Sequence, residues 1–147
     1  MTAIVIERTI ATTPERVFQA LTRADEIGRW WTNDLNITPE VGSLAEFRFG
    51  EWGEYRLRFE LAELNSERIR WLARPDGPPH WVGTSVTWRL APLQSGTMLS
   101  FTHEGFAPQV DEAYLVPVRG NWNYFLDSLK SYLETGKGTP GTPPYRR

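Results

Sequence analysis

Apolar residues occupy every second position in five segments between residues 45 and 103, the spacing of strands that are buried on one face only. In the fourth of these segments, for example, Val86, Trp88 and Leu90 alternate with polar residues. This pattern favours an antiparallel sheet with one apolar face, and that face needs a cover. The segments are separated by residues that favour turns, at positions 50–53, 65–66, 75–79 and 94–96.

The cover is expected from one long helix near the C-terminus, where an apolar stripe persists at helical spacing. The helix is expected to start close to Pro117, because a proline deeper inside would break it, and to stop at Gly136. A curved sheet that wraps around a helix need not close tightly, so a cavity can remain between the two. The stripe consists of Val118, Trp122, Phe125, Leu126, Leu129, Tyr132 and Leu133.

The residues before these segments predict a first strand and two short helices. Residues 3–11 are rich in Ile, Val and Thr, which is typical of a strand. Thr13 followed by Pro14 is typical of a helix start, because the hydroxyl caps the helix and proline fits its first turn. A second short helix is expected over residues 25–31. The predicted fold class is therefore α+β, with a curved antiparallel sheet wrapped around a long C-terminal helix.

Aromatic residues make up 13% of the chain and include seven tryptophans. A domain of this size does not need so many for stability, and such a surplus is typical of a pocket wall or an interface. Ile27, Trp30 and Trp31 are spaced so that both indoles can share the buried side of a helix. The sequence leaves open which of the two tryptophans seals the core and which faces a cavity.

Nine residues at inward-facing positions are the candidate ligand-binding residues. Among them, His103 is either a hydrogen-bonded core histidine or a polar contact for the head group of a ligand. The nine are Trp31, Phe49, Phe59, Trp71, Trp88, Phe101, His103, Trp122 and Phe125. Further candidates for polar pocket residues are Tyr55, Tyr114 and Asn121. Trp52 and Trp81 lie beside turns, so they are candidates for the rim of the pocket or for contacts with a partner.

Charge and composition exclude several classes of function. The formal net charge of −2 gives no general attraction to nucleic acid or to anionic membranes, and no apolar run is long enough to insert into a bilayer. With no cysteine and two separated histidines, we expect no metal, and without a catalytic or nucleotide-binding motif we expect no catalytic residue and no cofactor. Charges at Glu7 and Arg8 argue against a signal peptide, so a cytoplasmic location is expected.

One domain is expected over residues 1–136, followed by a flexible tail over 137–147 that is rich in Gly and Pro and has no periodicity. Alternating arginines in two of the predicted strands are expected on a solvated exterior, where glutamates neutralise them. These arginines are Arg56, Arg58, Arg68 and Arg70.

The segments "ERTIATTPERVFQALTRADEIGRWWT", "SFTHEGF" and "NWNYFLDSLKSYLETGKG" resemble the START-like (SRPBCC) superfamily. Within it, the chain is most similar to relatives of the activator of the ninety-kilodalton heat-shock chaperone ATPase. The resemblance covers nearly the whole chain before the tail, and its most specific features are the paired tryptophans and the spacing of Trp122, Leu126 and Leu129. It implies a helix-grip fold with a pocket for hydrophobic or amphipathic small molecules.

Two departures from the family affect what the resemblance implies. The residue before Trp122 is Asn121, where the family often has Gly. The large N-terminal domain of the eukaryotic co-chaperone has no counterpart in this sequence, so a chaperone partner is not expected.

The first functional hypothesis is a binding protein for a small hydrophobic or amphipathic molecule, held in an aromatic-lined cavity between the sheet and the long helix. One alternative is an enzyme of the same fold, a cyclase, aromatase or hydrolase acting on an apolar ligand. The other is an interaction module, a chaperone regulator or stress-response factor, which would expose a large apolar patch. Self-association as a homodimer is compatible with each hypothesis.

Overall fold

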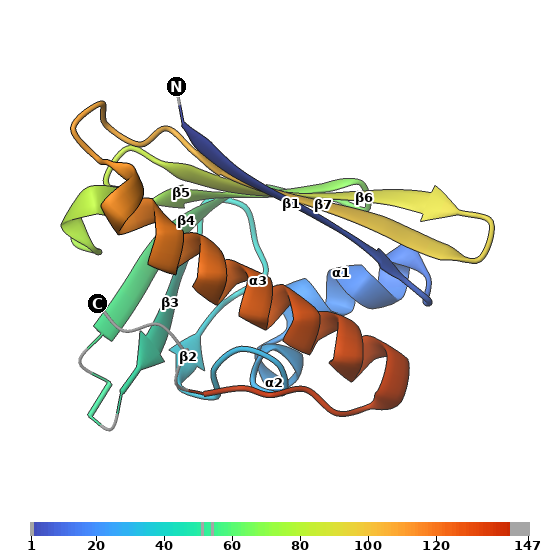
Figure 1. Cartoon of the computed structure of the whole chain (residues 1–147). Coiled ribbons are helices and arrows are strands. Elements are labelled where there is room, and N and C mark those ends of the chain that lie inside the picture. The colour runs from blue at the N-terminus through green and yellow to red at the C-terminus, as the bar shows by residue number, and fades with distance from the viewer. Residues whose placement is uncertain (1, 51, 54, 142–147) are drawn as a thin grey trace.

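The computed structural model describes residues 2–50, 52–53 and 55–141, so the predicted flexibility of residues 142–147 lies outside the described part of the chain. The described residues form one seven-stranded antiparallel sheet with the strand order β1-β7-β6-β5-β4-β3-β2 (Figure 1). The strands are β1 (Ala3–Ile10), β2 (Leu35–Asn36), β3 (Leu44–Phe49), β4 (Tyr55–Leu64), β5 (Arg68–Ala73), β6 (Ser85–Leu93) and β7 (Gly96–Glu104). The helices are α1 (Pro14–Thr22), α2 (Ala24–Ile27), the 3-10 turn η1 (Pro79–Trp81) and α3 (Glu112–Thr135).

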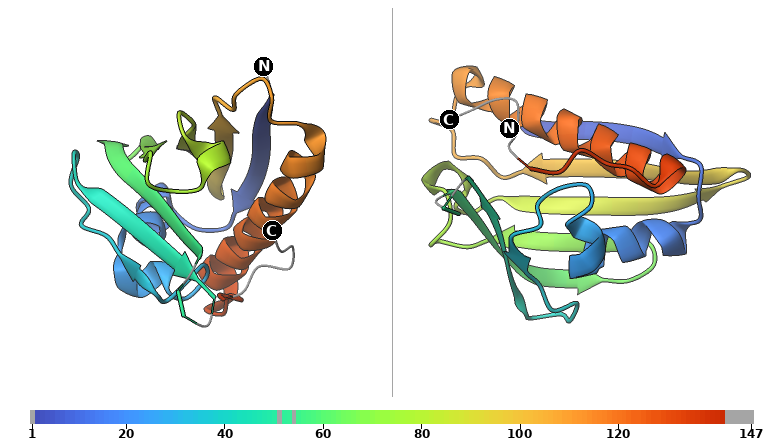
Figure 2. Two further views of the ribbon diagram at one scale, coloured as in Figure 1. Left: turned by 90° about the vertical axis from the view of Figure 1, so that its left-hand side faces the viewer. Right: turned by 90° about the horizontal axis from the view of Figure 1, so that it is seen from below.

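The sheet is strongly curved, and α3 lies along its concave side next to β1, as the two further views in Figure 2 show. The helix is tied to this edge strand, because the Arg8 guanidinium donates hydrogen bonds to Asp127 Oδ1 and Asn123 Oδ1, both at 2.8 Å. The short helices α1 and α2 cover the remaining part of the concave face (Figure 1). The predicted α+β helix-grip fold is therefore confirmed.

The period-two pattern places side chains as expected. Val86, Trp88 and Leu90 of β6 are 0%, 0% and 3% exposed. In the register of β6 and β7, Trp88 lies opposite Phe101 and Val86 lies opposite His103. Directly opposed residues share a face, so these side chains enter the core side by side.

The long helix starts five residues before the predicted position. It begins at Glu112, because the Asp111 side chain caps it by accepting a hydrogen bond from the Tyr114 backbone N–H at 3.2 Å. Pro117 is therefore the sixth residue of the helix and not part of its first turn. The predicted stop is confirmed, since Gly136 takes the left-handed conformation (φ 87°) that ends a helix.

The cap of α1 by Thr13 is confirmed, since its side chain accepts a hydrogen bond from the backbone N–H of Arg16 at 3.3 Å. The second helix is shorter than predicted. It ends at Ile27, and Trp30 and Trp31 lie in the turn that follows, with the Trp31 N–H still bonded to Ile27 O at 2.9 Å. Both tryptophans are nevertheless buried.

Three polar side chains, Arg16, Glu26 and Tyr132, join α1, α2 and α3. The Arg16 guanidinium contacts Glu26 Oε1 at 2.5 Å, and the Tyr132 hydroxyl donates to the same oxygen at 2.8 Å. Glu26 is only 8% exposed, and two donors compensate its lost hydration. This group connects α1, α2 and α3.

The segment after α3, over residues 137–141, is the described part of the predicted tail. Residues 137–141 turn back along α3 beside α2 (Figure 1), and the backbone N–H of Thr139 donates to Ser128 Oγ at 2.7 Å. Composition suggested flexibility because the segment has no apolar stripe. Its backbone groups make hydrogen bonds to α3 and to Trp31, and such bonds leave no pattern in the side chains.

On the outer face of the sheet, arginines of β3 and β4 pair with a glutamate, as expected from the alternation of charged residues in the sequence. A wide surface depression of ≈ 420 Å³ lies there, beside β3 and β4. Arg58 contacts Glu46 Oε1 at 2.5 Å, and Glu46 also pairs with Arg48. Burial alone would raise the pKa of Glu46, but the hydrogen bonds from Arg58 and Arg48 outweigh burial and hold this pKa below its usual value.

Within the described ranges, no helix is both long enough and apolar enough to cross a bilayer.

Candidate functional site

The centre of the core is an aromatic cluster around Trp31, which comes from the turn after α2. The Trp31 ring stacks on Trp30 (centroids 5.7 Å apart, planes 11° apart) and on Trp71 (6.0 Å, 10°). Its other aromatic neighbours lie at centroid distances of 4.4 to 6.5 Å. They are Phe47 and Phe49 of β3 and Trp122 and Phe125 of α3.

The two adjacent tryptophans have different surroundings. The Trp30 indole N–H donates to the Ala20 carbonyl of α1 at 2.8 Å, so this ring seals the core against the short helices. Trp31 instead lines a hollow on the other side of the cluster. Of the two tryptophans, Trp30 is therefore the one that seals the core, and Trp31 is the one that faces the hollow.

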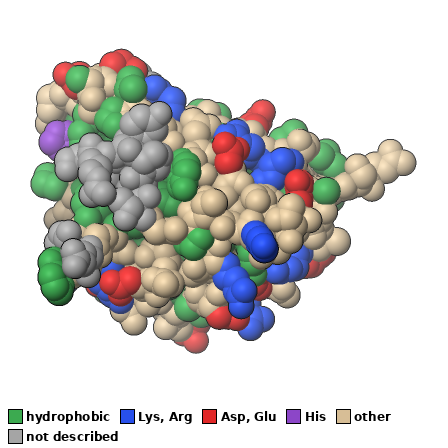
Figure 3. All heavy atoms as spheres, turned by 60° about the horizontal axis from the view of Figure 1, so that its bottom comes forward, with side chains coloured by type: hydrophobic (Ala, Val, Ile, Leu, Met, Phe, Trp, Pro, Cys, Tyr) green, Lys and Arg blue, Asp and Glu red, His purple; other side chains and the backbone are tan. Residues whose placement is uncertain are grey.

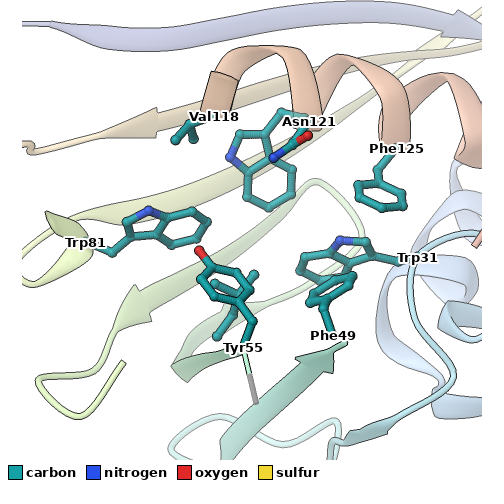
Figure 4. Close-up of a pocket in the computed structure, with 9 residues that line it drawn as sticks. Trp31, Phe49, Tyr55, Trp81, Val118, Asn121 and Phe125 are labelled. Atoms are coloured by element: carbon teal, nitrogen blue, oxygen red, sulfur yellow. The ribbon is translucent and has the colours of Figure 1, made fainter. Parts of the chain in front are cut away.

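The hollow lies between β3, β4, η1 and the N-terminal half of α3. Figure 4 shows Trp81 and Tyr55 on one side, Trp31, Phe49 and Phe125 on the other, and Val118 and Asn121 projecting from α3. The complete lining is Trp31, Phe49, Tyr55, Leu57, Trp81, Val118, Asn121, Trp122 and Phe125.

The hollow is small. The centre of a water molecule can stand in ≈ 20 Å³ of it. One water needs about 10–15 Å³ by this measure, so the space suits about one water. The sequence predicts a larger cavity between sheet and helix. The structure differs because the aromatic side chains expected to line that space fill most of it.

The nine candidate residues fall into two groups. Trp31, Phe49, Trp122 and Phe125 line the hollow. The other five lie in the packed core behind it, where four of them contact Trp31 or Trp122 and Phe59 contacts Trp81. These five are Phe59, Trp71, Trp88, Phe101 and His103, each 0% exposed.

The remaining lining residues have different signals in the sequence. Tyr55 and Asn121 carry polar groups on otherwise apolar faces, and Trp81 stands beside a turn, so these three were among the further candidates. Leu57 and Val118 were missed as site residues. Nothing distinguishes them from core residues in the sequence, since both simply continue apolar stripes.

His103 lies directly behind the hollow in a chain of hydrogen bonds. The Trp122 indole N–H donates to His103 Nδ1 at 3.2 Å. An indole nitrogen can only donate, so Nδ1 carries no proton and the neutral ring holds its proton on Nε2. His103 Nε2 then donates to Thr84 Oγ1 at 3.0 Å, and Thr84 Oγ1 donates to the Trp81 carbonyl at 2.6 Å.

This chain connects two walls of the hollow. Trp122 lies at one end and Trp81 at the other, and the Trp81 indole N–H donates in turn to the Tyr114 hydroxyl at 2.8 Å. His103 thus acts as a structural support that fixes two indoles that line the hollow. Across the described residues, no three side chains of the types that bind metals come together. The arrangement suits the binding of an apolar group.

The model of one protein family, "Activator of Hsp90 ATPase homolog 1-like protein", matches residues 11–134. The chain belongs to this family. Among solved structures, the Aha1 dimer from Colwellia psychrerythraea is 32% identical with a TM-score of 0.82, and the match covers 94% of this chain and 100% of that one. The predicted resemblance is therefore confirmed. Among curated proteins, no significant match to this sequence was found.

More distant structures of the same fold include a protein from Staphylococcus saprophyticus, which is 22% identical with a TM-score of 0.78 over 96% of this chain and 98% of that one. DynU16, from the dynemicin biosynthetic locus, is 21% identical with a TM-score of 0.75 over 92% of this chain and 48% of that one. At these identities the likeness concerns the fold alone.

Proposed function

We propose that the protein binds a small hydrophobic or amphipathic molecule at the hollow beside Trp31. The observation that carries the proposal is a concave site with an almost entirely aromatic and aliphatic wall, at the end of an aromatic core. Sites for apolar ligands have this composition, with a few polar groups that fix orientation. Here Tyr55 and Asn121 bring a hydroxyl and an amide to opposite sides of the wall (Figure 4).

The size of the hollow sets a condition on binding. A ligand larger than a water molecule has to displace side chains, and Trp31 is one of the side chains that separate the hollow from the packed core. The expected ligand is therefore a flat apolar molecule that can take over part of the stacking of the Trp31 ring. Its polar group would face Tyr55 or Asn121.

A matched pair of substitutions on α3 tests the proposal. Val118 lines the hollow and is 1% exposed, whereas Val116 is 55% exposed on the same helix. Val118→Phe should weaken the saturable binding of 1-anilinonaphthalene-8-sulfonate, measured by its fluorescence, at least tenfold. Val116→Phe should leave it unchanged. Equal affinity in both folded variants would place the dye elsewhere and contradict the proposal.

A second candidate function is self-association. The 32% identical protein from Colwellia psychrerythraea is described as a dimer. This chain exposes large apolar side chains at Trp52 (81%), Val116 (55%) and Val82 (43%). On the face shown in Figure 3, hydrophobic side chains gather at the left end, whereas basic and acidic side chains alternate over the right half.

Sedimentation equilibrium tests this second candidate. A homodimer would give twice the chain mass of 16.9 kDa, and Trp52→Glu should shift the equilibrium towards the monomer if Trp52, which lies between β3 and β4, is part of the contact. A single species of 16.9 kDa at every protein concentration would exclude self-association.

A further inference from the structure

The turn over residues 28–32 carries Trp31 into the core, and its backbone is held from outside by two other segments. The carbonyl of Trp30 accepts a hydrogen bond from Ser128 Oγ of α3 at 2.7 Å. The carbonyl of Trp31 accepts one from the backbone N–H of Gly141 at 2.8 Å. The Trp31 ring therefore cannot leave its place with its turn unless these bonds open.

The segment over residues 137–141, which we call the strap, makes the second of these bonds through Gly141 and contacts the donor of the first. Ser128 Oγ, while donating to Trp30, also accepts the backbone N–H of Thr139 at 2.7 Å. The start of the strap is fixed to α3, since Ser131 Oγ donates to the Lys137 carbonyl at 2.7 Å. The strap thus lies across the Trp31 turn and is bonded to it and to α3.

The contact between strap and turn is also close in space. A Cβ atom at Gly138 would lie 2.5 Å from the carbonyl oxygen of Arg29 and 3.0 Å from Trp30 Cα. Both neighbours are backbone atoms, so they cannot move aside as a side chain can. Only glycine allows the strap to pack directly on the turn.

We propose that the strap is a latch that controls access to the hollow: it holds the Trp31 turn closed, and its release lets the Trp31 ring move so that the hollow can enlarge. The role of this latch in ligand uptake rests on the proposed function. The claim that the strap holds the Trp31 turn is independent of the proposed function. The affinity measured on the whole protein is the affinity of the open form multiplied by the fraction of molecules that are open. Releasing the latch raises this fraction and should therefore tighten binding.

Two truncations test the latch with a built-in control. A chain that ends at Gly141 keeps the strap, whereas a chain that ends at Gly136 lacks it but keeps the whole of α3. Hydrogen exchange of the backbone amides in the 28–32 turn should become at least tenfold faster in the shorter chain and stay unchanged in the longer one. Gly138→Ala in the full chain should accelerate the same amides, because the added Cβ pushes the strap away.

Exchange at the same rate in all four proteins would overturn the latch, whether or not any ligand binds. The second measurement is the affinity for 1-anilinonaphthalene-8-sulfonate, which should increase at least fivefold in the chain that ends at Gly136. Faster exchange without any dye binding would support the latch and reject the proposed function. Dye binding with unchanged exchange would support the proposed function and reject the latch.

Discussion

Replacing Trp31 by alanine tests whether one side chain both completes the core and closes the hollow. The ring is 1% exposed and lies among six aromatic neighbours, so its removal opens a space that rigid rings cannot fill. Removal of a buried Trp typically costs about 3–5 kcal/mol. Because a domain of this kind is stable by about 5–15 kcal/mol, the variant should still fold but unfold at clearly lower urea concentration.

Indole should partly restore this loss, since it matches the removed ring and the new space is apolar. At a free indole concentration of ten times its Kd, linkage predicts a gain of about 1.4 kcal/mol in the free energy of unfolding. The control is Trp52→Ala, which makes the same chemical change at an 81% exposed position and should alter stability by less than about 0.5 kcal/mol. A loss below about 1 kcal/mol for Trp31→Ala, or equal stabilisation of both variants by indole, would refute the reasoning.

Three other substitutions have expected outcomes in urea denaturation. Thr84→Val should lower the free energy of unfolding by about 1–3 kcal/mol, because His103 Nε2 loses a buried acceptor; an unchanged midpoint would contradict the assigned hydrogen-bond chain. Glu46→Gln should be less stable than the parent at pH 7, and the difference should shrink as the pH falls from the usual pKa of 4.5 through the lower folded-state pKa. The reason is that the hydrogen bonds that lower the folded-state pKa of Glu46 stabilise only its ionised form; a gap that does not change with pH would argue against it. Pro117→Ala should raise stability by about 1–3 kcal/mol, because alanine restores a backbone donor inside α3; a loss of stability would show that the proline ring packs favourably there.

The elements of the fold could be predicted because each has its own period. Alternation over β3 to β7 and the stripe on α3 identify the sheet and its cover, and these patterns reflect which side chains must leave water. Boundaries were less accurate where a polar cap decides them. Asp111 starts α3 by bonding one backbone N–H, and this single contact outweighs the proline six residues later.

The site was harder to predict because it depends on how volumes add up in three dimensions. Periodicity shows that Trp71, Trp88 and Phe101 point inward, but it does not show whether such rings surround space or fill it. The strap was missed for another reason. Its contacts are made by backbone groups and by a glycine without a side chain, so the composition of residues 137–141 contains no sign of them.

The position of Trp31 makes stability and ligand access depend on the same side chain. The ring stacks between Trp30 and Trp71 within 11° of both planes, and on its free side it forms the wall of the hollow. Any movement that admits a ligand must therefore give up part of this stacking, and the ligand has to replace it. Changes that loosen the strap lower the free energy difference between the closed and open forms without touching the stack itself. Such changes should increase affinity at a small loss of stability, whereas changes in the stack should reduce stability far more than they alter access.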